Sequence, residues 1–218
     1  VLTGTHPGKL NMRKDYIVTQ WSVEFRVNMS RLGTKIGELN NQALFAAGPG
    51  SGHDAKEGEI YIRFGDAPIP GNILQVKTQG TQINCPTPFN ANQWYHLAFV
   101  CDGPKLTIYV DGKIEAVLDL PNIPLSLVHD SFGICCSGNY LKAEVMMSEL
   151  RFWTKAISQS QIQNNMFTIN PQTEGLEGYW KLNEGEGSIF NDATGHNNTG
   201  IAPNGVVRWV HGIRSDAK

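Results

Sequence analysis

The feature that most constrains this chain is the alternation of apolar and polar residues over short runs. In residues 16–30, "YIVTQWSVEFRVNMS", the apolar residues Trp21, Val23, Phe25 and Val27 occupy every second position. Side chains two positions apart lie on the same face of a strand but not of a helix. The run therefore predicts a β-strand with one buried face and one polar, exposed face.

Similar runs, rich in β-branched and aromatic residues, recur at 41–48, 58–66, 72–79, 92–103, 104–121, 130–138, 143–154, 177–182 and 205–213. The 23 glycines and 11 prolines of the 218-residue chain are spread between these runs, as expected for many turns. Run 92–103 is apolar on both faces, which indicates a strand inside a sheet. No alternation of strands with helices is visible, so the fold class predicted is all-β, a two-sheet antiparallel β-sandwich (jelly roll) with one short helix.

Two local motifs refine this prediction. Ser158 and Gln161 have the spacing of a capping box, and Ile162 and Met166 follow at helical spacing, so one short helix is expected within 156–167. The Asp111-Gly112 pair favours a tight hairpin turn. A two-residue loop and a bulged turn both remain open there.

Charge and hydropathy exclude several classes of function. The 18 basic and 20 acidic residues give a net charge of -2 without a block of one sign, so we expect no binding to nucleic acid. No run is long and apolar enough to span a membrane, and the first residues do not have the pattern of a signal peptide. Because the sequence begins at Val1, we expect a processed protein or an excised domain whose targeting signal lies elsewhere.

The four cysteines do not form a disulfide framework for a chain of this size. Cys85, Cys101, Cys135 and Cys136 are expected to be buried apolar thiols, and a single disulfide bridge remains an alternative. Among the histidines, His96 lies within a predicted strand, where a hydrogen-bonded core or interface histidine is expected.

Three segments in this order resemble a known family: "WYHLAFVCDGPKLTIYVDGKIEA", "ELRFWTKAISQSQIQNNM" and "GLEGYWKLNEGEGSIFNDATGHNNTG". The chain is similar, over about residues 15–205, to the laminin-G-like jelly roll within the concanavalin A-like lectin and glucanase superfamily. The shared features are a Tyr-Val-Asp-Gly hairpin, a strand leading into a short helix, and a closing Gly-x-Trp segment followed by Asp-x-Thr-Gly. Ser148 departs from the family pattern, since many relatives carry an acidic residue there.

The resemblance implies a single concanavalin A-like/laminin-G-like domain over residues 1–218, secreted or displayed at the cell surface within a larger multidomain protein. The function expected is non-catalytic binding of carbohydrate, a polysaccharide or another glycan. A protein-adhesion or architectural domain is the alternative, and a glycoside hydrolase is third.

A retaining glycoside hydrolase needs two carboxyl groups about 5 Å apart. The pairs Glu57 and Glu59, and Glu184 and Glu186, are the nearest candidates, but neither continues the alternating pattern of acids that the glucanase relatives carry on one strand. We therefore expect no catalytic residues.

Sugar binding needs an aromatic ring beside amide or carboxylate groups. Trp21, Trp94 and Trp180 are predicted to face the core, and Trp153 to pack near the short helix. The candidate ligand-binding residues are His53, Asp54, Phe64, Asp66, Phe89, Asn90, Asn139, Tyr140 and Trp209.

The segment 191–200 offers oxygen ligands of the kind that calcium accepts. The candidate metal ligands are Asp192, Thr194, Asn197 and Asn198, in a loop that contains Gly195 and Gly200. The alternative is a turn in which Asp192 and Thr194 accept hydrogen bonds from backbone N–H groups. Family members often carry calcium, so the resemblance favours a calcium ion as the possible cofactor.

Overall fold

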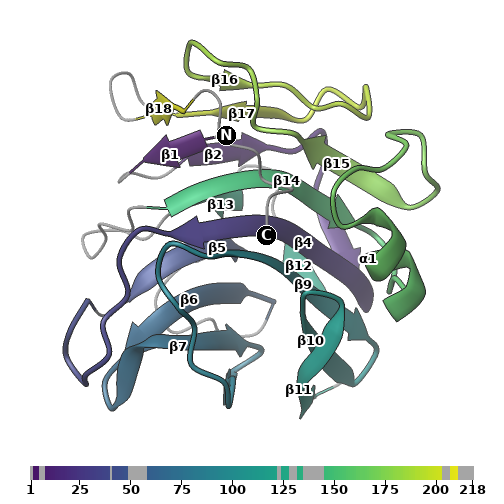
Figure 1. Ribbon diagram of the computed structural model, residues 1–218. Helices are drawn as coiled ribbons and strands as arrows, with labels where there is room; N and C mark the ends of the chain where they lie inside the picture. Colours follow the sequence, from purple (N-terminus) through teal and green to yellow (C-terminus); the bar gives the residue numbers. More distant parts are fainter. Residues whose placement is uncertain are drawn as a thin grey trace.

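A computed structural model describes residues 2–4, 8–39, 41–48, 58–121, 124–127, 132–134, 145–202 and 207–210. Two large antiparallel sheets lie face to face, and the helix α1 (Gln159–Asn165) lies beside the first of them (Figure 1). The predicted all-β sandwich with one short helix is confirmed.

The first sheet, sheet A, runs in the order β11-β10-β9-β4-β14-β1-β18, and β15 also pairs with β14. Its strands are β11 (Lys113–Asp119), β10 (Lys105–Val110), β9 (Trp94–Asp102), β4 (Gln20–Met29), β14 (Val145–Trp153), β1 (Leu2–Gly4), β18 (Val207–Trp209) and β15 (Leu176–Trp180). β9 lies between β10 and β4, as predicted for a strand that is apolar on both faces.

The second sheet, sheet B, runs in the order β16-β17-β2-β13-β5-β6-β7-β8. Its strands are β16 (Ile189–Phe190), β17 (Thr199–Ile201), β2 (Gly8–Asn11), β13 (Phe132–Ile134), β5 (Gln42–Ala47), β6 (Ile60–Asp66), β7 (Ile69–Thr78) and β8 (Thr81–Asn84). A separate pair is formed by β3 (Tyr16–Val18) and β12 (Leu125–Leu127).

The core lies between the two sheets and follows the alternation of the strands. Trp21, Val23, Phe25 and Val27 of β4 are fully buried there, together with the inward residues of both sheets. The Phe25 and Phe99 rings lie 5.9 Å apart, on paired strands. Large apolar side chains contribute about 1.5–3 kcal/mol each when fully buried, so this cluster is the main source of stability.

The opposite face of β4 was predicted to be exposed, and that prediction is wrong. Ser22, Glu24, Arg26 and Asn28 are all buried, because the chain after β14 folds back over them. The Ser22 hydroxyl, for example, donates to the carbonyl of Lys155 at 2.8 Å. Alternation in the sequence separates the two faces of a strand but does not show whether the polar face is covered.

The short helix forms where the capping box predicts it. The Ser158 hydroxyl accepts from the backbone N–H of Gln161, and the Gln161 side chain accepts from the backbone N–H of Ser158. Ile162 is buried in a second apolar cluster, on the outer face of sheet A. The helix is also tied to the β10–β11 turn, because the side chains of Gln159 and Gln163 both donate to the carbonyl of Gly112 at 2.9 Å.

The hairpin β10–β11 contains both of the features left open by the sequence. Asp111 and Gly112 form a two-residue loop with φ angles of 48° and 71°. Val110 pairs with Lys113 across this loop, and an irregularity in the pairing follows at Ile108 and Tyr109. The turn itself is a tight two-residue loop, and the β-bulge lies further along the two strands.

Three of the tryptophans lie where they were predicted to lie. Trp21 and Trp180 are fully buried in the core, and Trp153 packs in the cluster that contains Ile162. The prediction for Trp94 is wrong: it is half-buried, and the Arg26 guanidinium lies 5.8 Å from its ring. Trp94 shares the outer face of β9 with the Ala98 and Val100 side chains, because these residues are separated by even numbers of positions.

Cys85 and Cys101 are free and buried, as expected. Burial raises the pKa of the Cys85 thiol to about 12 and that of the Cys101 thiol to about 11. Cys135 and Cys136 lie outside the described residues.

Candidate functional site

The outer face of β6, β7 and β8, which points away from the core, carries two rows of polar side chains. Ile60, Ile62 and Phe64 of β6 point into the core, so Tyr61 and Arg63 point outward. The pairing places Arg63 beside Gln75 and Gln75 beside Asn84; the neighbouring row is Tyr61, Lys77 and Gln82. We call these six residues the polar grid.

The grid is held together by hydrogen bonds that start from Arg63. Its guanidinium donates to Gln75 Oε1 at 2.6 Å, to Asn41 Oδ1 at 2.9 Å and to the carboxylate of Asp66. Gln75 Nε2 in turn donates to Asn84 Oδ1 at 2.9 Å. Hydrogen bonds that involve charged groups are about twice as strong as neutral ones, so Arg63 fixes the orientation of its neighbours.

Burial and charge differ along the grid. Arg63 is fully buried, and this burial lowers the pKa of its guanidinium, although the nearby Asp66 charge acts in the opposite direction. An arginine remains protonated nevertheless. Asn84 and Gln82 are exposed and Lys77 is half-buried, so the grid extends from a buried cation to accessible amides. Asn84 Nδ2 makes no hydrogen bond to another described residue, which leaves a donor for a ligand.

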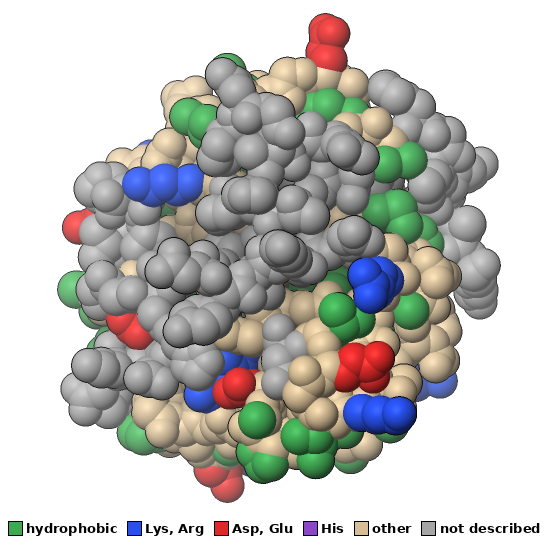
Figure 2. Space-filling view, turned by 90° about the vertical axis from the view of Figure 1, so that its left-hand side faces the viewer, with side chains coloured by type: hydrophobic (Ala, Val, Ile, Leu, Met, Phe, Trp, Pro, Cys, Tyr) green, Lys and Arg blue, Asp and Glu red, His purple; other side chains and the backbone are tan. Residues whose placement is uncertain are grey.

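On the face drawn in Figure 2, the coloured basic and acidic side chains are interspersed and form no large patch of one sign. The polar grid itself combines three amides and one hydroxyl with two cations, Arg63 and Lys77.

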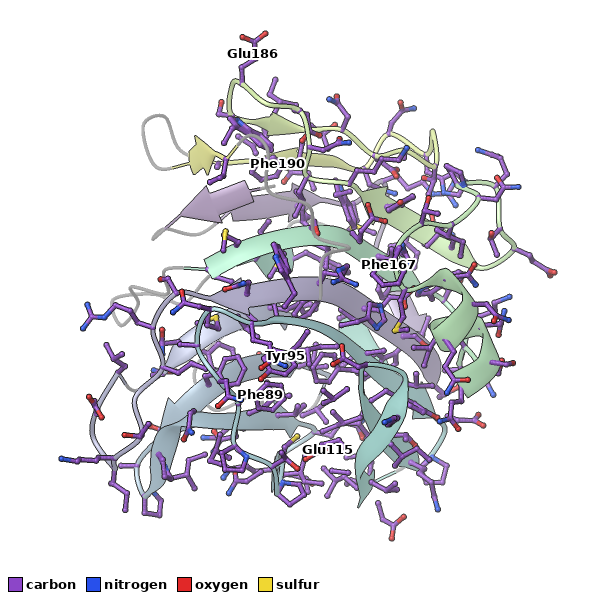
Figure 3. All side chains as sticks on the ribbon, in the orientation of Figure 1. Phe89, Tyr95, Glu115, Phe167, Glu186 and Phe190 are labelled. Atoms are coloured by element: carbon purple, nitrogen blue, oxygen red, sulfur yellow. The ribbon has the colours of Figure 1, made fainter. Side chains whose placement is uncertain are left out.

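The predicted ligand-binding residues do not all reach the surface. Asp66 is accessible and belongs to the Arg63 network. Phe64 and Phe89 are buried, with their rings 5.0 Å apart, so their expected role as exposed platforms is corrected. Figure 3 shows Phe89 next to Tyr95, whose ring lies 4.7 Å away.

Asn90 is exposed, and its backbone N–H donates to the Tyr95 hydroxyl. Trp209 is half-buried; its indole N–H donates to the carbonyl of Gly187 at 2.9 Å, and its ring lies 6.1 Å from that of Phe190. His53, Asp54, Asn139 and Tyr140 lie outside the described residues and stay predictions.

The predicted calcium loop has the geometry of a hydrogen-bonded turn. The Asp192 carboxylate accepts from the backbone N–H groups of Tyr179, Thr194 and Asn198, and from the Thr194 hydroxyl. Asn198 Oδ1 accepts from the backbone N–H of Arg13 at 2.8 Å.

The remaining candidate ligands are Thr194, whose hydroxyl accepts from the backbone N–H of His196, and the exposed Asn197. Asp192, Thr194 and Asn198 therefore have hydrogen-bond donors around their oxygens, as the alternative of a hydrogen-bonded turn predicts, and the calcium ion stays a prediction. No group of three His, Cys, Asp or Glu side chains able to hold a metal occurs in the part of the chain that the structure describes.

Of the acidic residues in the segments where a catalytic pair was considered, Glu59, Glu184 and Glu186 lie within the described part of the chain. Glu184 accepts a hydrogen bond from the backbone N–H of Asn191. Glu186 extends into solvent at the tip of its loop (Figure 3). Glu59 is buried, and Glu57 lies outside the described residues.

Sequence reasoning missed Arg63, Gln75 and Asn84. The alternation in "EIYIRFGD" does place Tyr61 and Arg63 on the face opposite Ile60, Ile62 and Phe64. What the sequence does not contain is the register of β6, β7 and β8, which is needed to bring these three side chains into one row.

The comparisons with known proteins agree with this fold. A laminin G family model, described as Concanavalin A-like lectin/glucanases superfamily, matches residues 5–163. No curated protein sequence matches the chain. In the described part of the chain, no helix has both the length and the apolar character needed to cross a membrane.

Many solved structures are similar, including the two that follow. One is a "putative carbohydrate binding protein" from Bacteroides ovatus ATCC 8483, with 25% identity and a TM-score of 0.74 over 96% of this chain. This chain spans 60% of the length of that protein. The other is the heptameric SAP-like pentraxin from Limulus polyphemus, with 14% identity and a TM-score of 0.54, covering 74% of this chain and 79% of the other. The sandwich and the family match together show that the chain belongs to the concanavalin A-like lectin/glucanases superfamily.

Proposed function

We propose that this chain is a non-catalytic carbohydrate-recognition module that contacts a glycan through the polar grid of sheet B. The observation that carries the proposal is the Arg63–Gln75–Asn84 row, in which a buried cation orients amides that end at the solvent. Protein sites that select sugars need polar groups of fixed orientation, because a mobile amide loses side-chain entropy on binding.

The grid offers hydrogen-bonding groups to a sugar, while its one aromatic ring, Tyr61, is buried and provides no exposed platform. Amide and hydroxyl groups can donate to and accept from vicinal hydroxyl groups, and an ammonium group can donate to them. The similarity to the Bacteroides ovatus protein agrees with a binding role. We infer binding without cleavage, in a protein that acts outside the cell, because the predicted acidic residues do not continue the alternating pattern of acids that the glucanase relatives carry on one strand.

Glycan-array binding tests the proposal. Asn84→Ala and Gln82→Ala remove exposed amides of the grid, and we expect each to weaken binding about three- to tenfold, the effect of losing one or two neutral hydrogen bonds. Asn164→Ala is the matched control, since Asn164 is an exposed amide on the helix α1, which lies beside sheet A and not sheet B.

Two results would contradict the proposal. One is glycan binding that both grid variants retain at full strength. The other is the absence of glycan binding together with binding of a partner protein, which would favour an adhesion domain. Release of a reducing end from a bound polysaccharide would instead indicate an enzyme.

A further inference from the structure

A cavity lies on the outer face of sheet A, whereas the polar grid lies on sheet B. It has a volume of about 500 Å³ and is bounded by β9, β10 and the segment that leads into α1. This volume lies within the range of roughly 300–1,000 Å³ that is typical of small-molecule sites. The cavity shares no residue with the polar grid.

The cavity exists because α1 covers only part of this face. Val100 of β9 and Tyr109 of β10 point outward and pack with Ile157 in the apolar cluster beneath the helix. Ser158 begins the helix there, so the ends of the two strands beyond it are left uncovered. Val100, Tyr109 and Ile157 form the apolar floor of the cavity, with 6%, 8% and 3% of their surfaces exposed.

The rim carries hydrogen-bonding groups that the protein itself does not use. The Tyr109 and Thr107 hydroxyls make no hydrogen bond to any residue that the structure describes. Asp102 uses one carboxylate oxygen, Oδ1, which accepts from Gln20 Nε2 at 2.6 Å, and its second oxygen is left for a ligand. A tyrosine hydroxyl is protonated at neutral pH and can donate, and burial raises the pKa of Tyr109 further above that range.

The charges of the rim argue for an uncharged ligand. The lining contains one acid, Asp102, and one base, Lys105, whose ammonium also lies 3.9 Å from the Asp119 carboxylate. A phosphate or a carboxylate would therefore gain little net attraction. An apolar floor with hydroxyl and carboxylate groups around it matches a ring that has one apolar face and several hydroxyl groups.

We propose that this cavity binds one neutral sugar ring, as a second site that is independent of the polar grid. The ring packs on Val100, Ile157 and the Tyr109 side chain. Its hydroxyl groups bond to the Tyr109 and Thr107 hydroxyls and to the Asp102 carboxylate.

The test uses the chain labelled with ¹⁵N and the methyl glycosides of glucose, galactose, mannose and xylose. Saturation-transfer difference spectra report binding, and the backbone amide shifts of Val100, Thr107 and Tyr109 locate it. Tyr109→Phe and Thr107→Val each remove a hydroxyl and keep the shape, so we expect each to lower the affinity about three- to tenfold. Thr34→Val, at an exposed threonine outside the cavity, is the matched control.

Asn84→Ala distinguishes this site from the grid, because it should leave the shifts of Val100, Thr107 and Tyr109 unchanged. The inference is overturned if none of the four glycosides shifts these amides, or if both cavity variants bind as well as the unmodified chain. It is also overturned if only a peptide or protein occupies the cavity. Loss of grid binding alone would contradict the proposed function and leave this second site standing.

Discussion

At the scale of single residues, the Glu24 carboxylate connects three strands beneath α1. Its Oε1 accepts from Arg151 Nη1 at 3.2 Å and from the Trp153 indole at 3.1 Å, and His96 Nε2 lies 3.2 Å from its Oε2. Burial alone would raise the pKa of Glu24, but His96 and the positive charge of Arg151 outweigh it, and the pKa lies below its ordinary value of 4.5. The carboxylate is therefore charged and paired in the folded protein.

Glu24→Gln should destabilise the fold, because Arg151 then loses one of its two carboxylate partners, Glu24 and Glu149. Breaking a buried ion pair costs about 3–5 kcal/mol, and we expect a loss near the lower figure, since Glu149 remains. Urea unfolding measures it, with Glu186→Gln as the control at an exposed glutamate.

The same variant has a defined dependence on pH. A carboxylate with a lowered pKa stabilises the folded state above its unfolded pKa, and this stabilisation is lost as the pH falls through the folded value. The difference in unfolding free energy between Glu24→Gln and the unmodified chain should therefore be constant near pH 7 and shrink below about pH 4.5. A difference that stays constant down to pH 2 would contradict the role given to Glu24.

Substitution of Asp192 tests whether segment 191–200 is a hydrogen-bonded turn or a calcium site. If the segment is a hydrogen-bonded turn that binds no calcium, addition of calcium or of a chelator should leave the melting temperature of the protein unchanged. Asp192→Ala should cost about 2 kcal/mol, because hydrogen bonds to a charged group are lost. A melting temperature that rises with calcium in the unmodified chain but not in Asp192→Ala would establish a calcium site instead.

At the scale of elements, α1 has only seven residues and depends on contacts outside itself. Helices this short are marginal in water, so the capping box, the buried Ile162 and the bonds to Gly112 decide whether it forms. The carbonyl of Asn165, at the end of the helix, accepts from Arg151 Nη1 at 2.7 Å. The helix is thus held at both ends.

Ser158→Ala should cost about 1 kcal/mol, the usual effect of losing an N-cap side chain. Hydrogen exchange should show faster exchange of the α1 amides, with little change in β5 or β6 of the other sheet. Ser188→Ala is the control, because Ser188 is a half-buried serine outside α1. Equal acceleration of exchange in both sheets would show that the cap acts on the whole fold.

At the scale of the whole molecule, stability comes from the apolar cluster between the two sheets. Phe99 on β9 is fully buried near the middle of sheet A and packs against Phe25. Domains of this kind have a total stability of about 5–15 kcal/mol, so one large core side chain is a substantial part of it.

Phe99→Ala should destabilise the chain by about 3–5 kcal/mol, through lost burial and a residual cavity. Urea unfolding gives the value, and Asn164→Ala, at an exposed amide of α1, should change it by less than about 0.5 kcal/mol. A loss below about 1 kcal/mol for Phe99→Ala would mean that the two sheets do not share a tightly packed core.

The sequence by itself determined the features that depend on near neighbours. These are the alternation in β4, the apolar run of β9, the Ser158 cap and the Asp111-Gly112 turn, and they follow from the local geometry of the backbone. Short strands such as β8, β12, β16 and β17 were missed, because two to four residues carry no readable period.

Only the tertiary structure decided which surfaces are covered and which strands are neighbours. Phe64 and Phe89 look like loop aromatics in the sequence, yet they meet in the core because sheet B closes over sheet A. Arg63, Gln75 and Asn84 form one row because of strand register, which long-range pairing sets. The physical reason is that contacts between residues far apart in the chain depend on the packing of both sheets together, which no single segment encodes.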